Sequence, residues 1–136
     1  MVVCEAGGVT RWDDAADWYL DMVRDPTQGF NHLAADIALE LAGPVRDRDV
    51  LDVGAGEGHL ARRLAHGGAR VVAVEPTDTL RAAAIDTETA TPLGIRYHGD
   101  RGSRVSRVGG RPLASRAPRT GLALRQGSRL LLACAG

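Results

Sequence analysis

Lysine is absent from this 136-residue chain, and all seventeen basic residues are arginine. Cysteine is scarce as well: Cys4 and Cys134 form no C-x-x-C pair, which argues against a disulfide framework and favours a reduced, cytoplasmic setting. No apolar run reaches the length of a membrane span, and no basic region precedes an apolar stretch at the N-terminus, so we expect neither a membrane partner nor a secretory signal. The four histidines are isolated and no Ser-His-Asp spacing occurs, so we assign no metal site and no catalytic residue.

Length and composition are those of one globular domain, with 44% hydrophobic and 25% charged residues. The formal net charge of zero conceals an asymmetry. Residues 1–100 hold all seventeen acids and nine arginines, a net charge of −8, whereas residues 101–136 hold eight arginines and no acid, a net charge of +8. The chain therefore changes character near residue 100.

The stretch VLDVGAGEG, residues 50–58, organises the rest of the sequence. A short apolar run leads into three glycines at alternate positions, and a helical pattern of Leu60, Ala61 and Leu64 follows. The change from period two to period 3.6 predicts a strand, a tight loop and a helix. Glycine allows a ligand to lie against bare backbone, and the start of the helix offers N–H groups and partial positive charge to an anionic group.

The pattern Asp52-x-Gly54-x-Gly56-x-Gly58 resembles the first motif of class I methyltransferases that use S-adenosylmethionine. The alternative is the dinucleotide fingerprint G-x-G-x-x-G, but its third glycine would fall at His59. A glycine turn without a ligand is a third interpretation, although such a turn need not bear the entropic cost of three glycines. The resemblance covers residues 11–100 and implies a cofactor, S-adenosylmethionine. The positions it implies for cofactor binding in this loop are Asp52, Gly54, Ala55, Gly56 and Gly58.

Three acids stand where strands are expected to end. Glu75, followed by Pro76, closes an apolar run, and a βαβ unit places its carboxylate beside the glycine loop. An ionised carboxylate accepts both ribose hydroxyls of a nucleoside, in S-adenosylmethionine and NAD alike, although a solvated strand-end charge is the simpler alternative. Asp52 has the matching place on the first strand, where we expect it to attract the ammonium of the methionine part, directly or through water. The resemblance places Asp100 near the adenine amino group, but Gly-Asp is also an ordinary turn.

The pattern of the first hundred residues predicts an α/β fold, a Rossmann-like parallel sheet that is truncated and preceded by helices. Trp18 and Tyr19 of the first helix are either core anchors or, as the resemblance implies, neighbours of the ligand. The second helix carries Leu33, Ile37 and Leu41 at helical spacing. The expected elements are helices at 11–24, 31–43, 60–66 and 78–86, and strands at 50–53, 71–74 and 95–98. The expected divisions are an N-terminal helical segment at 1–45, a partial cofactor-binding domain at 46–100 and an Arg/Gly-rich tail at 101–136.

The tail has three interpretations that stay open: out-of-frame translation of a GC-rich gene, a disordered basic arm that binds nucleic acid or an acidic partner, and a short variant of the fold. No fourth strand is visible in it, which would leave the strand at 50–53 without a neighbour. We therefore expect the tail to be disordered and the chain to be an inactive fragment.

The resemblance implies methyl transfer from S-adenosylmethionine to a small-molecule acceptor, with no nucleic acid or membrane partner. An NAD-binding oxidoreductase fragment and a non-catalytic basic binding module are the alternatives. Neither the acceptor nor the oligomeric state follows from the sequence.

Overall fold

The computed structural model describes residues 12–25 and 30–99, together with four short strands beyond residue 100. In chain order the elements are α1 (Trp12–Arg24), α2 (Phe30–Ala42), β1 (Asp49–Val53), α3 (His59–His66), β2 (Arg70–Val74), α4 (Asp78–Ala90), β3 (Arg96–His98), β4 (Arg107–Val108), β5 (Arg111–Pro112), β6 (Leu124–Gln126) and β7 (Arg129–Ala133).

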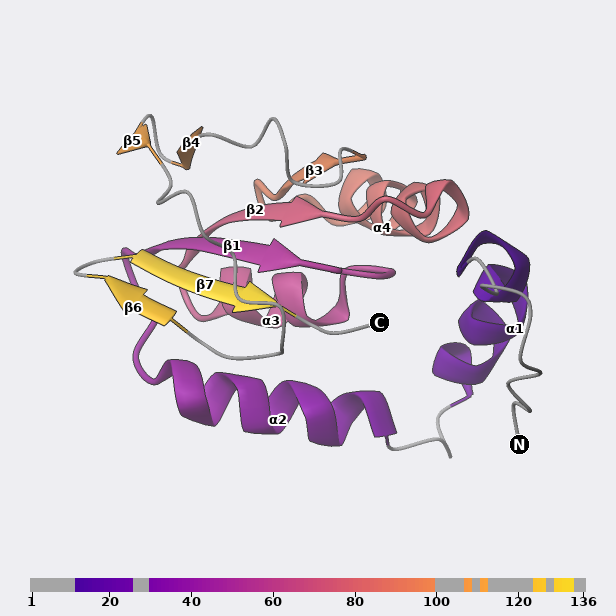
Figure 1. Cartoon of the computed structure of the whole chain (residues 1–136), viewed down its shortest axis with the longest axis horizontal. Helices are drawn as coiled ribbons and strands as arrows, with labels where there is room; N and C mark the ends of the chain where they lie inside the picture. Colours follow the sequence, from indigo (N-terminus) through magenta and orange to yellow (C-terminus); the bar gives the residue numbers. More distant parts are fainter. Residues whose placement is uncertain are drawn as a thin grey trace, which may run out of the picture.

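A five-stranded sheet in the order β3-β2-β1-β7-β6 forms the centre of the molecule (Figure 1). β1 pairs with β2 and β2 with β3, all in parallel, with α3 and α4 as the crossover helices. Parallel strands are covered on both faces, so their side chains are apolar on both. Val50 and Val71 join the core formed with α2 and α3, while Leu51 and Val72 belong to a separate cluster. This is the α/β arrangement that the sequence predicted.

The strand β7 corrects one expectation. The sequence predicted no fourth strand, a β1 without its second neighbour and a disordered tail, whereas β7 lies parallel to β1 over five residues and β6 pairs antiparallel with β7. The reason is the apolar run Leu130–Ala133, which has the length and composition of a strand inside a parallel sheet. One ground for expecting inactivity, the unpaired β1, is thereby removed. The divisions at residues 45 and 100 and the three interpretations of the tail stay predictions.

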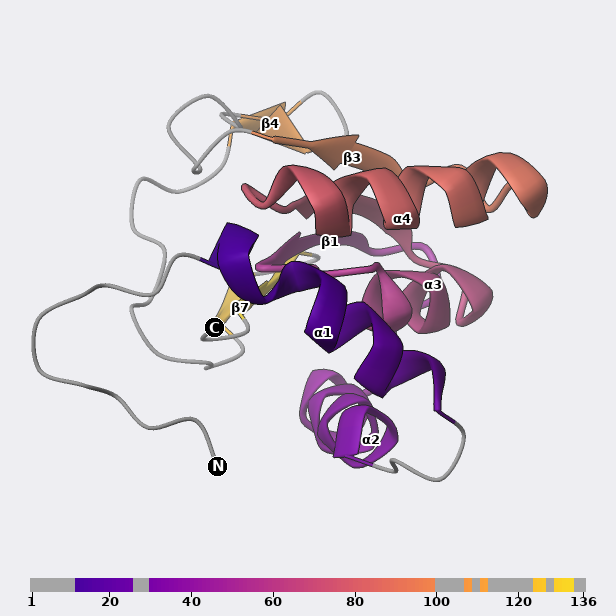
Figure 2. The ribbon, with the colours of Figure 1, turned by 90° about the vertical axis from the view of Figure 1, so that its right-hand side faces the viewer.

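Helix α1 lies in front of the carboxyl ends of the parallel strands. In Figure 1 the arrows of β1 and β2 point toward α1, and in Figure 2, seen from that side, α1 crosses between α2 and α4. Ala16 and Leu20 of α1 are buried against Leu80 of α4. The predicted N-terminal helical segment is therefore packed onto the sheet domain, and α1 covers the edge where the glycine loop begins. Among the helices that the structure describes, none is both long and apolar enough to cross a membrane.

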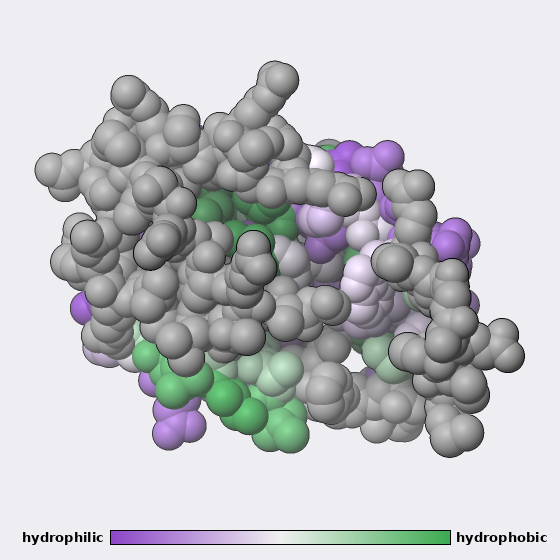
Figure 3. All heavy atoms as spheres, in the orientation of Figure 1, coloured by the Kyte–Doolittle hydropathy of each residue, from purple (hydrophilic) through white to green (hydrophobic). Residues whose placement is uncertain are grey.

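Helix α2 packs by its small residues. Ala35 and Ala42 are buried in the core with α3, which small side chains allow because the two backbones can approach closely. The larger apolar residues that defined this helix in the sequence lie outside: Leu33, Ile37 and Leu41 are 58%, 51% and 60% exposed. Figure 3 shows hydrophobic residues gathered over α2. The helical period was thus predicted correctly, but the face that packs is the alanine face.

Helix α4 continues four residues beyond its predicted end at residue 86. Thr87 and Thr89 direct their hydroxyls back to carbonyls of the preceding turn, and the polar stretch remains helical. Glu88 then organises the turn into β3, because its Oε1 accepts hydrogen bonds from the N–H groups of Leu93, Gly94 and Ile95 at 2.8, 2.7 and 3.1 Å.

Candidate functional site

The loop between β1 and α3 is bent by three glycines with positive φ: 76° at Gly54, 58° at Gly56 and 86° at Gly58. The loop is fixed to the end of β2, because the N–H groups of Gly54 and Ala55 donate to the Val74 carbonyl at 2.9 and 3.1 Å. The Gly58 N–H donates to the Ala55 carbonyl at 2.9 Å. These N–H groups are therefore used inside the protein, and the loop presents Cα surface to a ligand.

Gly56 and Gly58 have different surroundings. A Cβ at Gly56 would meet only the hydroxyl and ring edge of Tyr19, at 3.8 and 3.9 Å. A Cβ at Gly58 would collide with the Tyr97 hydroxyl and would lie 3.0 Å from Nη1 of Arg62. A Cβ at Gly56 would thus be in ordinary van der Waals contact with Tyr19 of α1, whereas Gly58 is required by the packing of β3 against α3.

Glu75 joins the end of β2 to the glycine loop. Its Oε2 accepts the Gly56 N–H at 2.8 Å, and its Oε1 accepts the Thr77 N–H at 2.8 Å. Its backbone N–H donates to the His98 carbonyl at 2.9 Å, and its carbonyl accepts from Arg81. The side chain is buried, yet a carboxylate has about four acceptor positions, so two stay open for further donors. The sequence prediction that this carboxylate lies beside the loop is confirmed by the first of these bonds.

Asp52 is completely buried at 0% exposure, and among the described residues no donor reaches either carboxylate oxygen. Burial, followed by the negative charges of Glu75 and Glu57, raises the pKa of Asp52 from 3.8 to about 7. Glu57, by contrast, is paired with Arg62 at 2.6 Å. Of the three neighbouring acids, Asp52 alone among the described groups has no partner.

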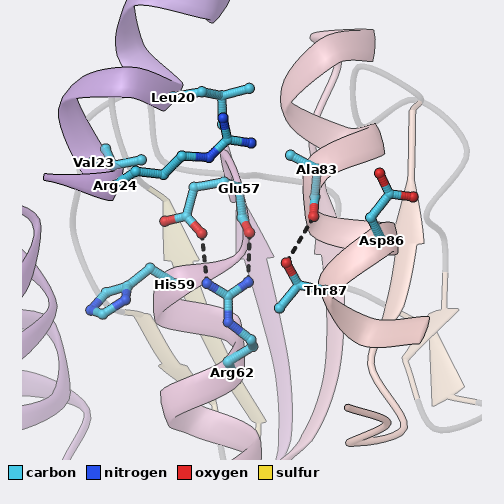
Figure 4. A pocket seen from close by; sticks show the side chains of 9 residues that line it. All are labelled: Leu20, Val23, Arg24, Glu57, His59, Arg62, Ala83, Asp86 and Thr87. Atoms are coloured by element: carbon cyan, nitrogen blue, oxygen red, sulfur yellow. Dashed lines mark hydrogen bonds and ion pairs between the residues drawn. The ribbon is translucent and has the colours of Figure 1, made fainter. Parts of the chain in front are cut away.

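A hollow of about 300 Å³ lies beside this cluster, between α1, α4 and the start of α3 (Figure 4). Glu57 and Arg62 stand at its centre, and the Arg62 guanidinium also donates to the Glu57 carbonyl at 2.6 Å. Arginines and acids both line the hollow, so it presents no single sign of charge. The lining residues are Leu20, Val23, Arg24, Glu57, His59, Arg62, Ala83, Asp86 and Thr87.

His59 is the histidine that lines the hollow. His59 is partly buried, which lowers its pKa, and its ring lies edge-on to that of His32 with the centroids 4.8 Å apart. Its Nε2 has no hydrogen-bond partner among the described residues. In the same part of the chain no three potential ligand residues come together as a metal site.

Six of the positions implied for the cofactor meet at one place, the carboxyl edge of β1 and β2: Asp52, Gly54, Ala55, Gly56, Gly58 and Glu75. Pro76 is exposed just after Glu75, and Asp100 lies outside the described residues. Tyr19 lies toward the loop, whereas Trp18 is 57% exposed and is no core anchor. The sequence did not predict that Tyr97 would lie against Gly58 or that Glu57 would pair with Arg62, because both contacts are tertiary.

Comparison with known proteins supports a methyltransferase origin for this part of the chain. No protein-family model matches. The chain is 36% identical over 84 residues to ubiquinone biosynthesis O-methyltransferase of Yersinia enterocolitica, a match that covers 59% of this chain and 33% of that protein. The chain thus spans about a third of the length of this curated relative.

One solved structure gives the fold. Magnesium protoporphyrin IX methyltransferase from Synechocystis PCC 6803 superposes with a TM-score of 0.52 at 19% identity, covering 65% of this chain and 48% of that one. An RNA methyltransferase from Salinibacter ruber has a TM-score of 0.45 at 24% identity, with 49% and 46% covered. The described part of the chain has a Rossmann-like fold of the class I methyltransferase type. The resemblance to class I S-adenosylmethionine-dependent methyltransferases is confirmed for the N-terminal part.

Proposed function

We propose that residues 12–99 bind S-adenosylmethionine and belong to a methyltransferase that acts on a small molecule. The observation that carries this proposal is the pair of buried carboxylates at the glycine loop: Glu75, which accepts the Gly56 N–H, and Asp52, which has no partner among the described residues. A buried acid without a partner suits a ligand with a cationic amino group, and an acid with spare acceptor positions suits ribose hydroxyls.

The proposed cofactor site comprises the loop and the two strand ends. In this site Asp52 pairs with the amino group of the cofactor, and Glu75 accepts hydrogen bonds from its ribose hydroxyls. The Cα surface of the loop leaves room for the part of the cofactor that joins these two groups. The bound cofactor supplies an activated methyl group on a sulfonium, so the protein's task is to orient the reactants and exclude water. The full set of proposed residues is Asp52, Gly54, Ala55, Gly56, Gly58, Glu75 and Pro76, with Asp100 outside the described residues.

The charge of the described part favours a small-molecule acceptor over nucleic acid. Residues 12–25 and 30–99 hold fifteen acids and eight arginines, a net charge of −7. This negative charge disfavours contact of the described part with a phosphate backbone, whose affinity for proteins depends on basic contacts, whereas residues 101–136 carry a net charge of +8. NAD binding and the basic binding module are not favoured, since the matched relatives are methyltransferases.

Titration of the 136-residue chain with S-adenosylhomocysteine and, separately, with NADH tests the proposal. We expect saturable binding of the first and none of the second. Gly56→Val should abolish the binding, because the branched side chain takes the ligand's place and is strained at a φ of 58°. Gly94→Val is a matched control, since Gly94 also has positive φ but a Cβ there meets nothing within 4 Å. Equal affinity in both variants would refute the proposed site.

A further inference from the structure

The three acids around the glycine loop differ in how their charge is stabilised. The oxygens of Glu75 each accept a backbone N–H, and Glu57 is paired with Arg62. Asp52 has no hydrogen bond or ion pair among the described residues and no contact with water. When three neighbouring carboxylates cannot all be ionised at low cost, a shared proton resides on the least stabilised one.

Among the side chains that the structure describes around Asp52, none is an unpaired cation that could replace such a proton. From β2 it faces Glu75, from the loop Glu57, and from β3 the hydroxyl of Tyr97, whose own pKa is raised to about 12 by its burial. Arg62 of α3 is engaged by Glu57. On the β7 side the residue opposite Asp52 in the register is the apolar Leu132. The protonated acid is thus the form that this environment favours.

We propose that Asp52 is a proton-exchange residue, which holds a proton when no ligand is bound and releases it to solvent when a cationic amino group docks against it. The proposal rests on the proposed function, because it requires a ligand with an amino group at this loop. The balance is simple: the neutral carboxyl loses one proton to the buffer, and the resulting carboxylate pairs with the ammonium of the ligand. No other bond is made or broken.

This exchange makes affinity depend on pH and on the amino group. Below the pKa of Asp52, a rise of one pH unit makes release of its proton about tenfold more favourable. The dissociation constant of S-adenosylhomocysteine should therefore fall about tenfold from pH 5 to pH 6 and level off above pH 7. 5′-Methylthioadenosine, which has the nucleoside but no amino acid part, should bind with an affinity that does not change over this range.

Calorimetric titration in two buffers of different ionisation enthalpy counts the protons directly. At pH 6 we expect about one proton released per S-adenosylhomocysteine bound by the unmodified chain and none by Asp52→Asn. Asp49→Asn is the matched control, because Asp49 lies on the same strand at its far end and is paired with Arg70. That variant should release the same number of protons as the unmodified chain.

A measurement without ligand separates the failure of this inference from failure of the proposed function. Carboxyl NMR of the unliganded chain should show one group titrating near neutral pH, absent from Asp52→Asn. A carboxyl at its ordinary pKa, or binding of S-adenosylhomocysteine without proton release, would overturn the inference. Absence of binding by the unmodified chain, with the neutral carboxyl still present, would instead refute the proposed cofactor.

Discussion

Replacing Asp52 by asparagine should remove the pH dependence that this residue imposes on stability. The pKa of Asp52 is about 7 in the folded chain against 3.8 when unfolded. Between these values the folded chain holds a proton that the unfolded chain has lost, so stability falls as the pH rises from about 4 to about 7. A shift of about three units corresponds to a loss of about 4 kcal/mol by pH 8.

Urea unfolding from pH 4 to pH 8 measures this effect as the difference in unfolding free energy between the variant and the unmodified chain. That difference should move in favour of Asp52→Asn by about 4 kcal/mol across the range, with most of the change between pH 4 and pH 7. His59, whose pKa is lowered, contributes a slope of the opposite sign, but it is present in both proteins and cancels. Parallel curves for the two proteins would show that Asp52 is not held neutral and would refute the reasoning.

Three further substitutions test the surroundings of the loop. Glu75→Gln should weaken binding of S-adenosylhomocysteine by about 1–3 kcal/mol. The same substitution should weaken binding of a deoxyribose analogue much less. Equal losses of affinity for both ligands would exclude a contact between Glu75 and the ribose. Tyr19→Phe should weaken binding of S-adenosylhomocysteine by about 1 kcal/mol, because its hydroxyl lies next to Gly56. Trp18→Phe, on the exposed side of α1, is the control. Equal affinities of the two variants in calorimetry would show that the Tyr19 hydroxyl does not contact the ligand. Tyr97→Phe should raise the unfolding free energy by about 1–2 kcal/mol, since the hydroxyl is buried without a partner among the described residues; lower stability by thermal melt would contradict this.

The βαβ unit could be predicted from the sequence because its signals are local. The change of period around Gly54 and Gly56 and the acid that ends the next strand lie within one short stretch. The position of Glu75 beside the loop then follows from the geometry of a right-handed crossover, and the 2.8 Å bond to Gly56 confirms it.

The pairing of β7 with β1 could not be predicted in the same way. The register joins Leu51 to Leu131, two residues far apart in the chain, and no local pattern specifies such a partner. The apolar run was visible, but a short run that follows an arginine-rich and glycine-rich stretch is a weak signal. The outward face of α2 was missed for a related reason: helical spacing gives the period, while the choice of packing face depends on what the neighbouring helix can accommodate.

The structure also distinguishes Gly56 from Gly58, although the sequence predicted the same role, cofactor binding, for both glycines. The spacing of the motif is the same at both glycines. The difference comes from a tertiary contact, because Tyr97 leaves no space for a side chain at Gly58, whereas a Cβ at Gly56 would not collide with a neighbour. Because the N–H groups of Gly54, Ala55 and Gly56 all donate within the protein, the proposed function assigns ligand contacts to the neighbouring side chains rather than to these three amides.

The Glu75 carboxylate accepts the Gly56 N–H, which fixes the loop, and the Thr77 N–H, and in the proposed function it also accepts the ribose hydroxyls of the cofactor. A ligand that draws this carboxylate toward its hydroxyls changes the bond that shapes the surface on which the ligand itself lies. Loop shape and ligand affinity are thus coupled through one side chain, and a loss of affinity in Glu75→Gln contains both contributions. The deoxyribose analogue separates them, because it keeps the dependence on loop shape while removing part of the direct contact.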